Sequence, residues 1–203
     1  MDWKRLTSTV TFLGTFPGRL PEAEQPEVAF VGRSNVGKSS AINALLNRRK
    51  AARVSGTPGR TQAVNLFRVS ETVVFADLPG YGFAKAPDSV RRAWGKLVRR
   101  YLFKRDALAL VVQLVDARHP AQKGDIEMVD MLSEAEVPFI VVATKIDRVK
   151  RSKQNAHLSA IAKGLGIDSS QIIPFSSTEK QGLDLVWSVL LDVVGEFDLP
   201  TLG

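Results

Sequence analysis

The sequence predicts an α/β fold in which helices cover both faces of a mostly parallel sheet of about six strands, with one antiparallel hairpin. Short apolar runs alternate with longer amphipathic stretches along most of the chain. Residues 108–115 are almost all apolar, which is typical of a strand that is buried on both faces. Parallel strands need crossover connections, and the amphipathic stretches lie where such helices are required.

Each apolar run and each amphipathic stretch predicts one element. Strands are expected at residues 28–31, 63–69, 73–76, 108–115, 139–143 and 172–175. The second and third runs are expected to pair as the hairpin, with a turn at Ser70 and Glu71. Helices are expected at residues 38–47, 89–104, 126–132, 153–163 and 183–194, the fourth being closed by Gly164. Along 89–104 the apolar residues recur at helical spacing through Trp94 and Tyr101, so this stripe is expected to face the core.

Length and composition indicate one folded unit. The chain has 203 residues, of which 44% are hydrophobic and 24% charged, close to the average of globular proteins. We expect one domain at residues 26–197. It follows an N-terminal extension at 1–25 that adds a strand or packs on the sheet, and a short tail at 198–203 ends the chain.

Composition also excludes several classes of function. The chain has no cysteine, which excludes disulfides, cysteine nucleophiles and thiolate metal sites. Its two histidines argue against a multi-histidine zinc centre. No apolar run reaches the ~18–20 residues that span a bilayer, and residues 1–13 do not resemble a secretory signal. We therefore expect a cytoplasmic protein without a membrane partner. We also expect it to be a monomer.

The most specific motif is GRSNVGKS at residues 32–39, which fits G-x-x-x-x-G-K-[ST] between an expected strand and an expected helix. In such a loop the backbone N–H groups and the helix N-terminus bind phosphates. Lys38 would reach the β- and γ-phosphates, and the Ser39 hydroxyl would ligate Mg²⁺. The expected nucleotide contacts are Gly32, Arg33, Ser34, Asn35, Val36, Gly37, Lys38, Ser39 and Ser40. This loop indicates a nucleotide without identifying the base.

Three further motifs follow later strands. Asp77, Leu78, Pro79 and Gly80 fit D-x-x-G, in which the carboxylate holds Mg²⁺ through water and the glycine N–H approaches the γ-phosphate. Thr144, Lys145, Ile146 and Asp147 fit [NT]-K-x-D. The Asp147 carboxylate can accept hydrogen bonds from guanine N1–H and the 2-amino group, a donor pair that adenine lacks. Ser176 and Ser177, after the last strand, are placed to bind guanine O6.

Together five segments resemble the EngB family of bacterial GTPases, within the Era-like group. They are GRSNVGKSS (32–40), GTPGRTQ (56–62), DLPGYGFA (77–84), TKID (144–147) and FSS (175–177). The resemblance implies a P-loop GTPase fold and a protein that binds GTP and GDP and hydrolyses GTP. It also implies a role in late assembly of the large (50S) ribosomal subunit, and hence in normal cell division.

The resemblance also implies the full set of ligand contacts. GTP would be bound by residues 32–39, 59–63, 77–80, 144–147 and 175–177, which adds Gly59, Arg60, Thr61, Gln62, Ala63 and Phe175 to the residues named above. Mg²⁺ would be held by Ser39 and Thr61, and by Asp77 through water. Thr57 is the alternative to Thr61.

The residue that positions the attacking water is not identified by the sequence. Tyr81 follows D-x-x-G, where Ras-type enzymes carry a water-orienting glutamine. Turnover by the protein alone is therefore expected to be slow and to need a partner or a cation. Lys38 and Asn35 are candidate stabilisers of transition-state charge. Asn35 matches an asparagine that binds K⁺ in some Era-like relatives, or it only braces the loop.

The net charge of +7 is unevenly distributed. Residues 33–105 contain 16 Lys and Arg against 3 Asp and Glu, a net charge of +13, so the remaining residues carry −6. Most of the excess lies in two clusters, Arg48, Arg49, Lys50, Arg53 and Arg60, and Arg91, Arg92, Lys96, Arg99, Arg100, Lys104 and Arg105. One-sided charge of this kind favours binding to RNA phosphates.

Taken with this charge, the resemblance implies that the partner is the rRNA of a large-subunit precursor, bound through Arg48, Arg49, Arg91, Arg92, Lys96, Arg99 and Arg100. Two other interpretations stay open. One is an RNA-binding protein in which the nucleotide is only structural, and the other is a P-loop ATPase. The segment 144–147 argues against the ATPase.

Overall fold

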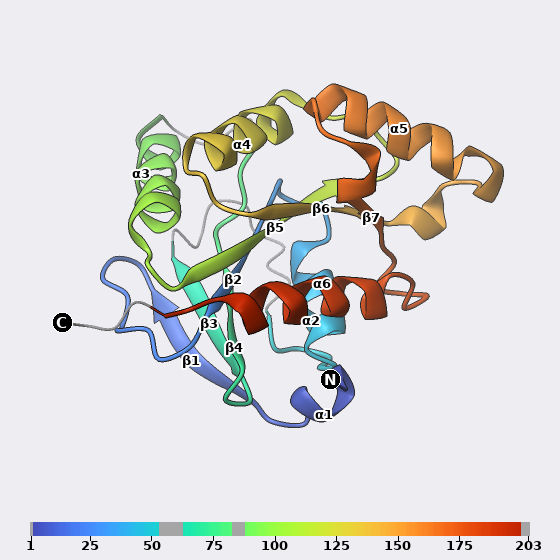
Figure 1. Cartoon of the computed structure of the whole chain (residues 1–203). Helices are drawn as coiled ribbons and strands as arrows, with labels where there is room; N and C mark the ends of the chain where they lie inside the picture. Colours follow the sequence, from blue (N-terminus) through green and yellow to red (C-terminus); the bar gives the residue numbers. More distant parts are fainter. Residues whose placement is uncertain (1, 53–62, 83–87, 200–203) are drawn as a thin grey trace.

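A computed structural model describes residues 2–52, 63–82 and 88–199 (Figure 1). One seven-stranded sheet runs through it, in the order β1-β3-β4-β2-β5-β6-β7. Its strands are β1 (Val10–Phe16), β2 (Glu27–Gly32), β3 (Val64–Val69), β4 (Val73–Asp77), β5 (Leu108–Asp116), β6 (Phe139–Thr144) and β7 (Ile172–Pro174). The helices are α1 (Trp3–Leu6), α2 (Lys38–Leu45), α3 (Asp88–Lys104), α4 (Lys123–Glu134), α5 (Gln154–Leu165) and α6 (Leu183–Glu196). Short 3₁₀ turns are η1 (Ile146–Arg148), η2 (Arg151–Lys153) and η3 (Ser169–Gln171).

The strand pairing confirms the predicted α/β class. β2 pairs in parallel with β4 and β5, and β5, β6 and β7 continue in parallel. β3 and β4 form the expected antiparallel hairpin. The seventh strand, β1, comes from the N-terminal extension and pairs antiparallel with β3 at the sheet edge. None of the residues of β1 is buried, so its apolar side chains do not form a core-facing run like those of the central strands.

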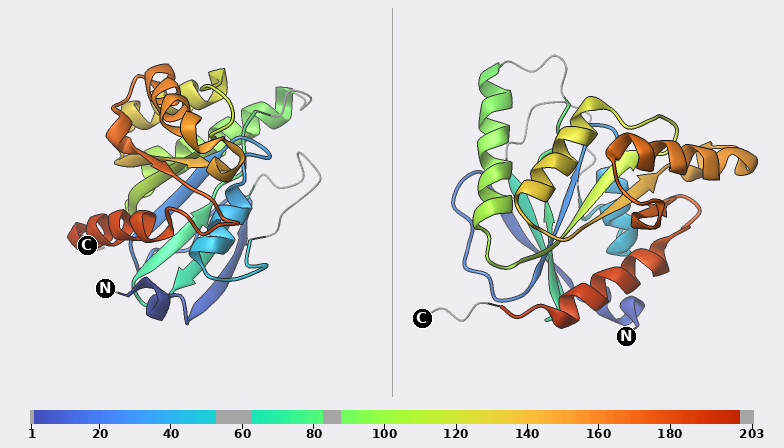
Figure 2. Two further views of the ribbon diagram at one scale, coloured as in Figure 1. Left: turned by 90° about the vertical axis from the view of Figure 1, so that its right-hand side faces the viewer. Right: turned by 45° about the horizontal axis from the view of Figure 1, so that its top comes forward.

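Helices cover both faces of the sheet, as Figure 2 shows. On one face α2 and α6 pack on β2 and β5 around the buried Trp187, and α1 adds Trp3 to this layer. On the other face α3 and α4 pack around Val98, Tyr101 and Met128, and α5 covers the β6 side. The predicted apolar stripe of α3 therefore does face the core.

Two helices differ from their expected bounds for local reasons. α5 ends at Leu165, and Gly166, with φ 68°, is its C-cap. Gly164 lies inside the helix against the Ala121 side chain, so the expectation that Gly164 closes the helix was wrong. α4 begins three residues before the apolar run, because Gln122 and Asp125 form a capping box at its start.

The parallel pairing brings the carboxyl ends of β2, β4, β5, β6 and β7 to one edge of the sheet. The loops that leave this edge contain the predicted motifs. In open α/β sheets this edge is where ligands bind. Within the described residues, no helix is both long and apolar enough to span a bilayer.

Candidate nucleotide-binding site

The phosphate loop leaves β2 and turns directly into α2. Gly37 has φ 106° and stands at the N-cap of α2, a conformation that a side chain would strain. Lys38 and Ser39 are the first two residues of the helix, so their N–H groups belong to its positively polarised end. Asn35, in the middle of the loop, is exposed. This geometry is suited to a phosphate group.

The D-x-x-G segment after β4 lies against the phosphate loop. The Tyr81 N–H donates to the Gly32 carbonyl at 3.2 Å, and the Ser34 N–H donates to the Tyr81 carbonyl at 2.9 Å. A Cβ at Gly80 would lie 3.2 Å from the Gly32 carbonyl oxygen, a tight contact, so this close approach favours glycine. The two loops are therefore held together by two backbone hydrogen bonds of Tyr81, next to a residue without a side chain.

Lys38 and Asp77 meet between these loops. The Lys38 ammonium pairs with the Asp77 carboxylate, whose second oxygen accepts from the Asn65 amide at 3.4 Å. Both charged groups are largely shielded from solvent, and a pair in that setting is little screened. Ser39 lies next to Lys38 in the same helical turn. A hydroxyl and a carboxylate are hard oxygen donors, which suits Mg²⁺.

The segment after β6 is tied to the same loop from the other side. The Thr144 hydroxyl donates to the Val36 carbonyl at 2.6 Å. Lys145 has φ 58°, and its ammonium donates to the Asn35 carbonyl at 2.6 Å. The stem of Lys145 therefore crosses from the segment after β6 to the phosphate loop.

Asp116, at the end of β5, holds Lys145 in this position and was not predicted as a site residue. Its carboxylate accepts from Lys145 at 2.8 Å and from Arg118 at 2.7 Å. Burial opposes its ionisation, but the hydrogen bonds from Arg118 and Lys145 outweigh burial and hold the pKa of Asp116 well below its usual value. The charge that orients Lys145 is therefore present at neutral pH. The place of Asp116, at a strand end on the ligand-binding edge, is the signal that could have found it.

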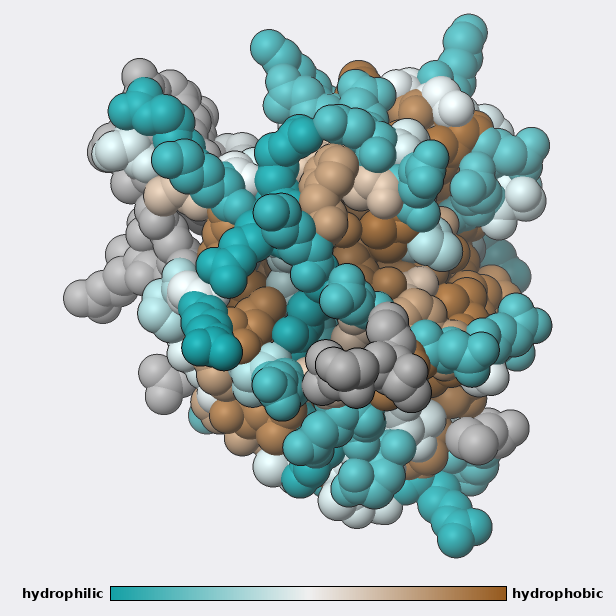
Figure 3. All heavy atoms as spheres, turned by 60° about the vertical axis from the view of Figure 1, so that its left-hand side comes forward, coloured by the Kyte–Doolittle hydropathy of each residue, from teal (hydrophilic) through white to brown (hydrophobic). Residues whose placement is uncertain are grey.

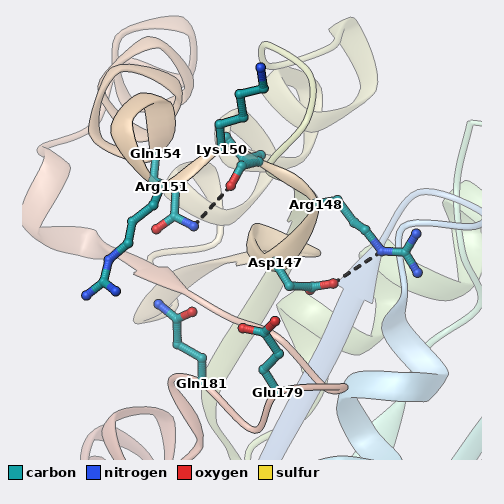
Figure 4. Close-up of a pocket in the computed structure, with 8 residues that line it drawn as sticks. Asp147, Arg148, Lys150, Arg151, Gln154, Glu179 and Gln181 are labelled. Atoms are coloured by element: carbon teal, nitrogen blue, oxygen red, sulfur yellow. Dashed lines mark hydrogen bonds and ion pairs between the residues drawn. The ribbon is translucent and has the colours of Figure 1, made fainter.

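Asp147 lies in η1 beside a cavity of about 620 Å³, shown in Figure 4. Its carboxylate accepts from the Arg148 guanidinium at 3.2 Å. Glu179 and Gln181, from the loop between β7 and α6, line the same cavity. The Ile146 N–H donates to the Phe175 carbonyl at 3.2 Å and so joins this motif to the loop after β7.

In the loop after β7, the side chains of Phe175 and Ser176 pack or hydrogen-bond within the protein, while the backbone contacts the segment after β6. Phe175 is buried in the core beside α6. Ser176 is also buried, and its hydroxyl accepts from the Glu179 N–H at 3.0 Å. Ser177 is only partly exposed. Any contact that Phe175 and Ser176 make with a ligand is therefore expected through their backbone.

Part of the expected site lies outside the described residues. Gly59, Arg60, Thr61 and Gln62 belong to this part, as does the alternative Thr57. Ala63 is described and is buried just before β3 begins. The structure thus brings together four of the five expected nucleotide-binding segments at one edge of the sheet.

Comparison with known proteins decides the family. A family model described as "50S ribosome-binding GTPase" matches residues 27–145. A "Probable GTP-binding protein EngB" of Streptococcus pyogenes serotype M28 is 48% identical over 175 residues, covering 86% of this chain and 88% of the relative. The chain belongs to the EngB family of GTP-binding proteins.

Solved structures agree with this membership at the level of the fold. A crystal structure of a probable GTP-binding protein EngB matches with a TM-score of 0.69 and 24% identity, covering 84% of this chain and all of that one. A crystal structure of Era, solved with MgGDPNP and nucleotides 1506–1542 of 16S ribosomal RNA, also has a TM-score of 0.69. It is 24% identical, covering 90% of this chain and 60% of that one. As an EngB-type member of the P-loop GTPase family, the protein is a GTP-binding protein and a GTP hydrolase.

Tyr81, at the position where Ras-type enzymes carry glutamine, points into the protein interior of this EngB-family chain. Its side chain is 5% exposed, and its hydroxyl donates to Asp125 of α4 at 3.1 Å. Its ring packs against Trp94 of α3, with the ring centroids 5.8 Å apart. The Trp94 indole N–H donates to the Pro79 carbonyl at 2.8 Å. The D-x-x-G segment is therefore attached to α3 as well as to the phosphate loop.

The basic residues of α3 have two different roles. Arg92, Lys96 and Arg100 are exposed. Figure 3 brings forward the side of the molecule on which Figure 1 shows α3, and hydrophilic side chains cover much of that surface. Arg99 pairs with Glu134 at 2.7 Å, and Arg105 pairs with the buried Glu27 at 2.6 Å. These two arginines hold α3 to α4 and to the base of β2.

The other basic residues are placed as follows. Arg49 and Lys50 are exposed after α2, and Arg48 donates to the Ser8 carbonyl. The side chain of Arg91 lies outside the described part of the chain.

Proposed function

We propose that this protein is a GTP-hydrolysing switch that assists late assembly of the large (50S) ribosomal subunit and is needed, through that role, for normal cell division. The observation that carries the proposal is the attachment of α3 to the D-x-x-G segment through Trp94. The exposed cations Arg92, Lys96 and Arg100 lie on this same helix. A movement of the D-x-x-G segment at the γ-phosphate would therefore be transmitted to α3 and to the exposed cations that would bind RNA.

The nucleotide would be held by the segments that meet at the sheet edge. The backbone of residues 32–39 and the start of α2 would receive the phosphates, with Lys38 against the β- and γ-oxygens. Asp147 would accept from guanine N1–H and the 2-amino group, and the Lys145 stem would stack on the base. The tether from Lys145 to Asp116 and to the Asn35 carbonyl supports this orientation.

Mg²⁺ would be held by Ser39, by Thr61 and, through water, by Asp77. It would neutralise charge that develops on the phosphate oxygens during hydrolysis. Lys38 pairs with Asp77 and can exchange this partner for a phosphate, since both are oxyanions that accept from an ammonium. The ion pair thus keeps Lys38 on the phosphate side of the site.

No glutamine or arginine among the described residues has been identified that would stabilise the charge on the phosphate oxygens in the transition state. Because the Tyr81 side chain is turned inward, we propose that a bound K⁺ near Asn35 or the ribosomal particle supplies the missing contribution. K⁺ should then raise turnover above that in Na⁺, and Asn35→Ala should abolish the difference. Equal rates of phosphate release in both salts would exclude the K⁺ role.

The partner would be the rRNA of a large-subunit precursor, and the protein would act as a monomer in the cytoplasm. Two likenesses support an RNA partner. The matching family is described by 50S ribosome binding, and the structurally similar Era was solved with a fragment of 16S rRNA. Arg48, Arg49, Arg91, Arg92, Lys96 and Arg100 would contact phosphates, and Arg99 contributes mainly by holding α3 to α4.

The decisive experiment is pelleting of the protein with large-subunit precursors. Binding should be tight with a non-hydrolysable GTP analogue and weaker with GDP, because the switch model makes the basic surface depend on the γ-phosphate. Free nucleotide-binding affinity is measured in parallel, so that loss of nucleotide is not mistaken for loss of RNA binding. Equal pelleting with both nucleotides would contradict the switch.

Two alternative functions give different results. If the protein is a P-loop ATPase, ADP should compete with GTP for binding. If it is the proposed GTPase, GDP should compete with GTP and ADP should not. An RNA-binding protein with a structural nucleotide would not turn over. Multiple turnovers of GTP in the presence of ribosomal particles would exclude that alternative.

A further inference from the structure

A buried polar network lies beneath the phosphate loop and joins three elements. Its centre is Asp125 in the first turn of α4, which is 1% exposed. The Asp125 carboxylate accepts from Arg33 of the phosphate loop and from the Tyr81 hydroxyl, each at 3.1 Å. It also accepts from the Gln122 N–H at 3.0 Å, which caps α4. Asp125 thus receives hydrogen bonds from both loops of the nucleotide site.

The network continues into the sheet through Gln113 of β5, which is fully buried. The Gln113 amide donates to the Asp125 carbonyl at 2.8 Å and lies 3.4 Å from the Tyr81 hydroxyl. The Tyr81 hydroxyl is therefore enclosed by groups that belong to α4 and β5, which are rigid elements. Burial, and then the negative charge of Asp125, raise the pKa of Tyr81, so the hydroxyl remains a donor.

Tyr81 is the residue that connects this network to the nucleotide site. Its backbone makes two hydrogen bonds with the phosphate loop, at Gly32 and Ser34. Its neighbour Gly80 is the residue whose N–H would face the γ-phosphate. The side chain of Tyr81 is bound to α4 and its main chain is bound to the phosphate loop. These bonds restrict rotation of the neighbouring Gly80 peptide.

We infer that Tyr81 and Asp125 are positioning residues, which hold the Gly80 amide in the orientation that binds the γ-phosphate. This inference rests on the proposed function, because it concerns the step at which GTP is distinguished from GDP. Neither side chain faces the nucleotide. Their effect is transmitted through the Tyr81 main chain, and it applies to GTP alone, since GDP has no group opposite Gly80.

A second network in the same chain provides a matched control. Tyr101 of α3 donates to Glu27 at the start of β2, and Glu27 also pairs with Arg105. This is again a buried tyrosine, carboxylate and arginine, but it lies at the other end of β2 from the phosphate loop. Tyr81→Phe and Tyr101→Phe each remove one buried hydroxyl and leave the ring in place. Loss of stability alone should therefore affect both variants similarly.

The test compares GDP and a non-hydrolysable GTP analogue by calorimetric titration of the full chain with Mg²⁺. Tyr81→Phe should weaken binding of the GTP analogue about fivefold, the typical effect of one lost hydrogen bond, with less than about a twofold change for GDP. Tyr101→Phe should leave the ratio of the two affinities unchanged. Asp125→Asn should shift the ratio in the same direction and further, because Arg33 then loses its charged partner.

Two results would overturn the inference. One is an unchanged affinity ratio in Tyr81→Phe, and the other is an equal shift in Tyr101→Phe. If Asp125→Asn does not fold, Tyr81→Phe decides alone, because it removes a single atom. The proposed function would fail differently, since the unaltered chain would then not turn over GTP or would not pellet with large-subunit precursors in a nucleotide-dependent way.

Discussion

Tyr81 and Tyr101 are the two tyrosines of the chain, and both place their hydroxyl on a buried carboxylate. In each case burial, followed by the charge of the neighbouring carboxylate, raises the pKa of the phenol well above its usual value. The folded protein should therefore keep both tyrosines protonated where the unfolded chain ionises them. The stability that they contribute is complete below about pH 10 and is lost as the pH rises further.

This property gives a direct titration. At about pH 11 the native protein should show almost no phenolate absorbance, and unfolding by urea should release the signal of two tyrosines. The free energy of unfolding should fall by up to about 1.4 kcal/mol per pH unit for each tyrosine above pH 10. Each Tyr→Phe variant should remove half of the absorbance change. Phenolate absorbance in the native state at that pH would contradict the buried geometry.

Asp147 permits a second prediction at the scale of the residue. If its carboxylate accepts from the guanine 2-amino group, the unaltered chain should bind GDP more tightly than inosine diphosphate, which lacks that group. Asp147→Asn should weaken GDP binding by about tenfold or more, because the carboxylate acceptor is lost, and should erase most of this preference. Calorimetry measures both. An Asp147→Asn variant that kept the preference would show that another group reads the 2-amino position.

At the scale of the element, α3 has an apolar side that faces the core and an exposed basic side. One ion pair is formed from within the helix and another from the residue that follows it. Trp94 joins its first half to the D-x-x-G segment, and Arg99 and Arg105 fasten its second half to α4 and β2. The exposed cations of the same helix, named above, are the residues whose charge is available to a polyanion.

Neutralising those cations should weaken RNA binding without changing nucleotide affinity. The variant Arg92→Gln, Lys96→Gln, Arg100→Gln should reduce the slope of the logarithm of affinity against the logarithm of salt concentration by about 2 to 3, the value for three lost phosphate contacts. The matched control removes three exposed cations elsewhere, Lys4→Gln, Arg5→Gln and Lys163→Gln. An equal effect of the control would mean that only net charge matters.

At the scale of the whole molecule, the N-terminal segment completes the fold from a distance. β1 adds the edge strand beside β3, and Trp3 stacks on Trp187 with the rings 3° from parallel. The Trp3 indole N–H donates to Asp184 at 2.6 Å. These contacts join the first residues of the chain to α6, more than 180 residues later in the sequence.

This docking should contribute stability but not ligand affinity. Trp3→Ala should lower the free energy of unfolding by about 1–2 kcal/mol, because it removes an aromatic stack and a hydrogen bond. GDP affinity should not change, since α1 packs beside α6 and the phosphate loop leaves the carboxyl end of β2. Urea denaturation and calorimetric titration check the two parts separately. A large loss of GDP affinity would show that the N-terminal segment also supports the site.

Local sequence patterns were enough to predict the α/β class, the hairpin and the order of the candidate nucleotide-binding motifs, because periodicity and loop motifs depend on residues that are close in the chain. The sequence allowed a strand in the N-terminal extension but did not locate β1, none of whose residues is buried. It also did not indicate the contacts of Asp116 and Asp125, which lie outside any motif. The inward orientation of Tyr81 and the ion pairs of Arg99 and Arg105 are visible only in the folded protein. Such pairings join residues that are tens of positions apart, and their geometry exists only once the sheet and its helices have packed.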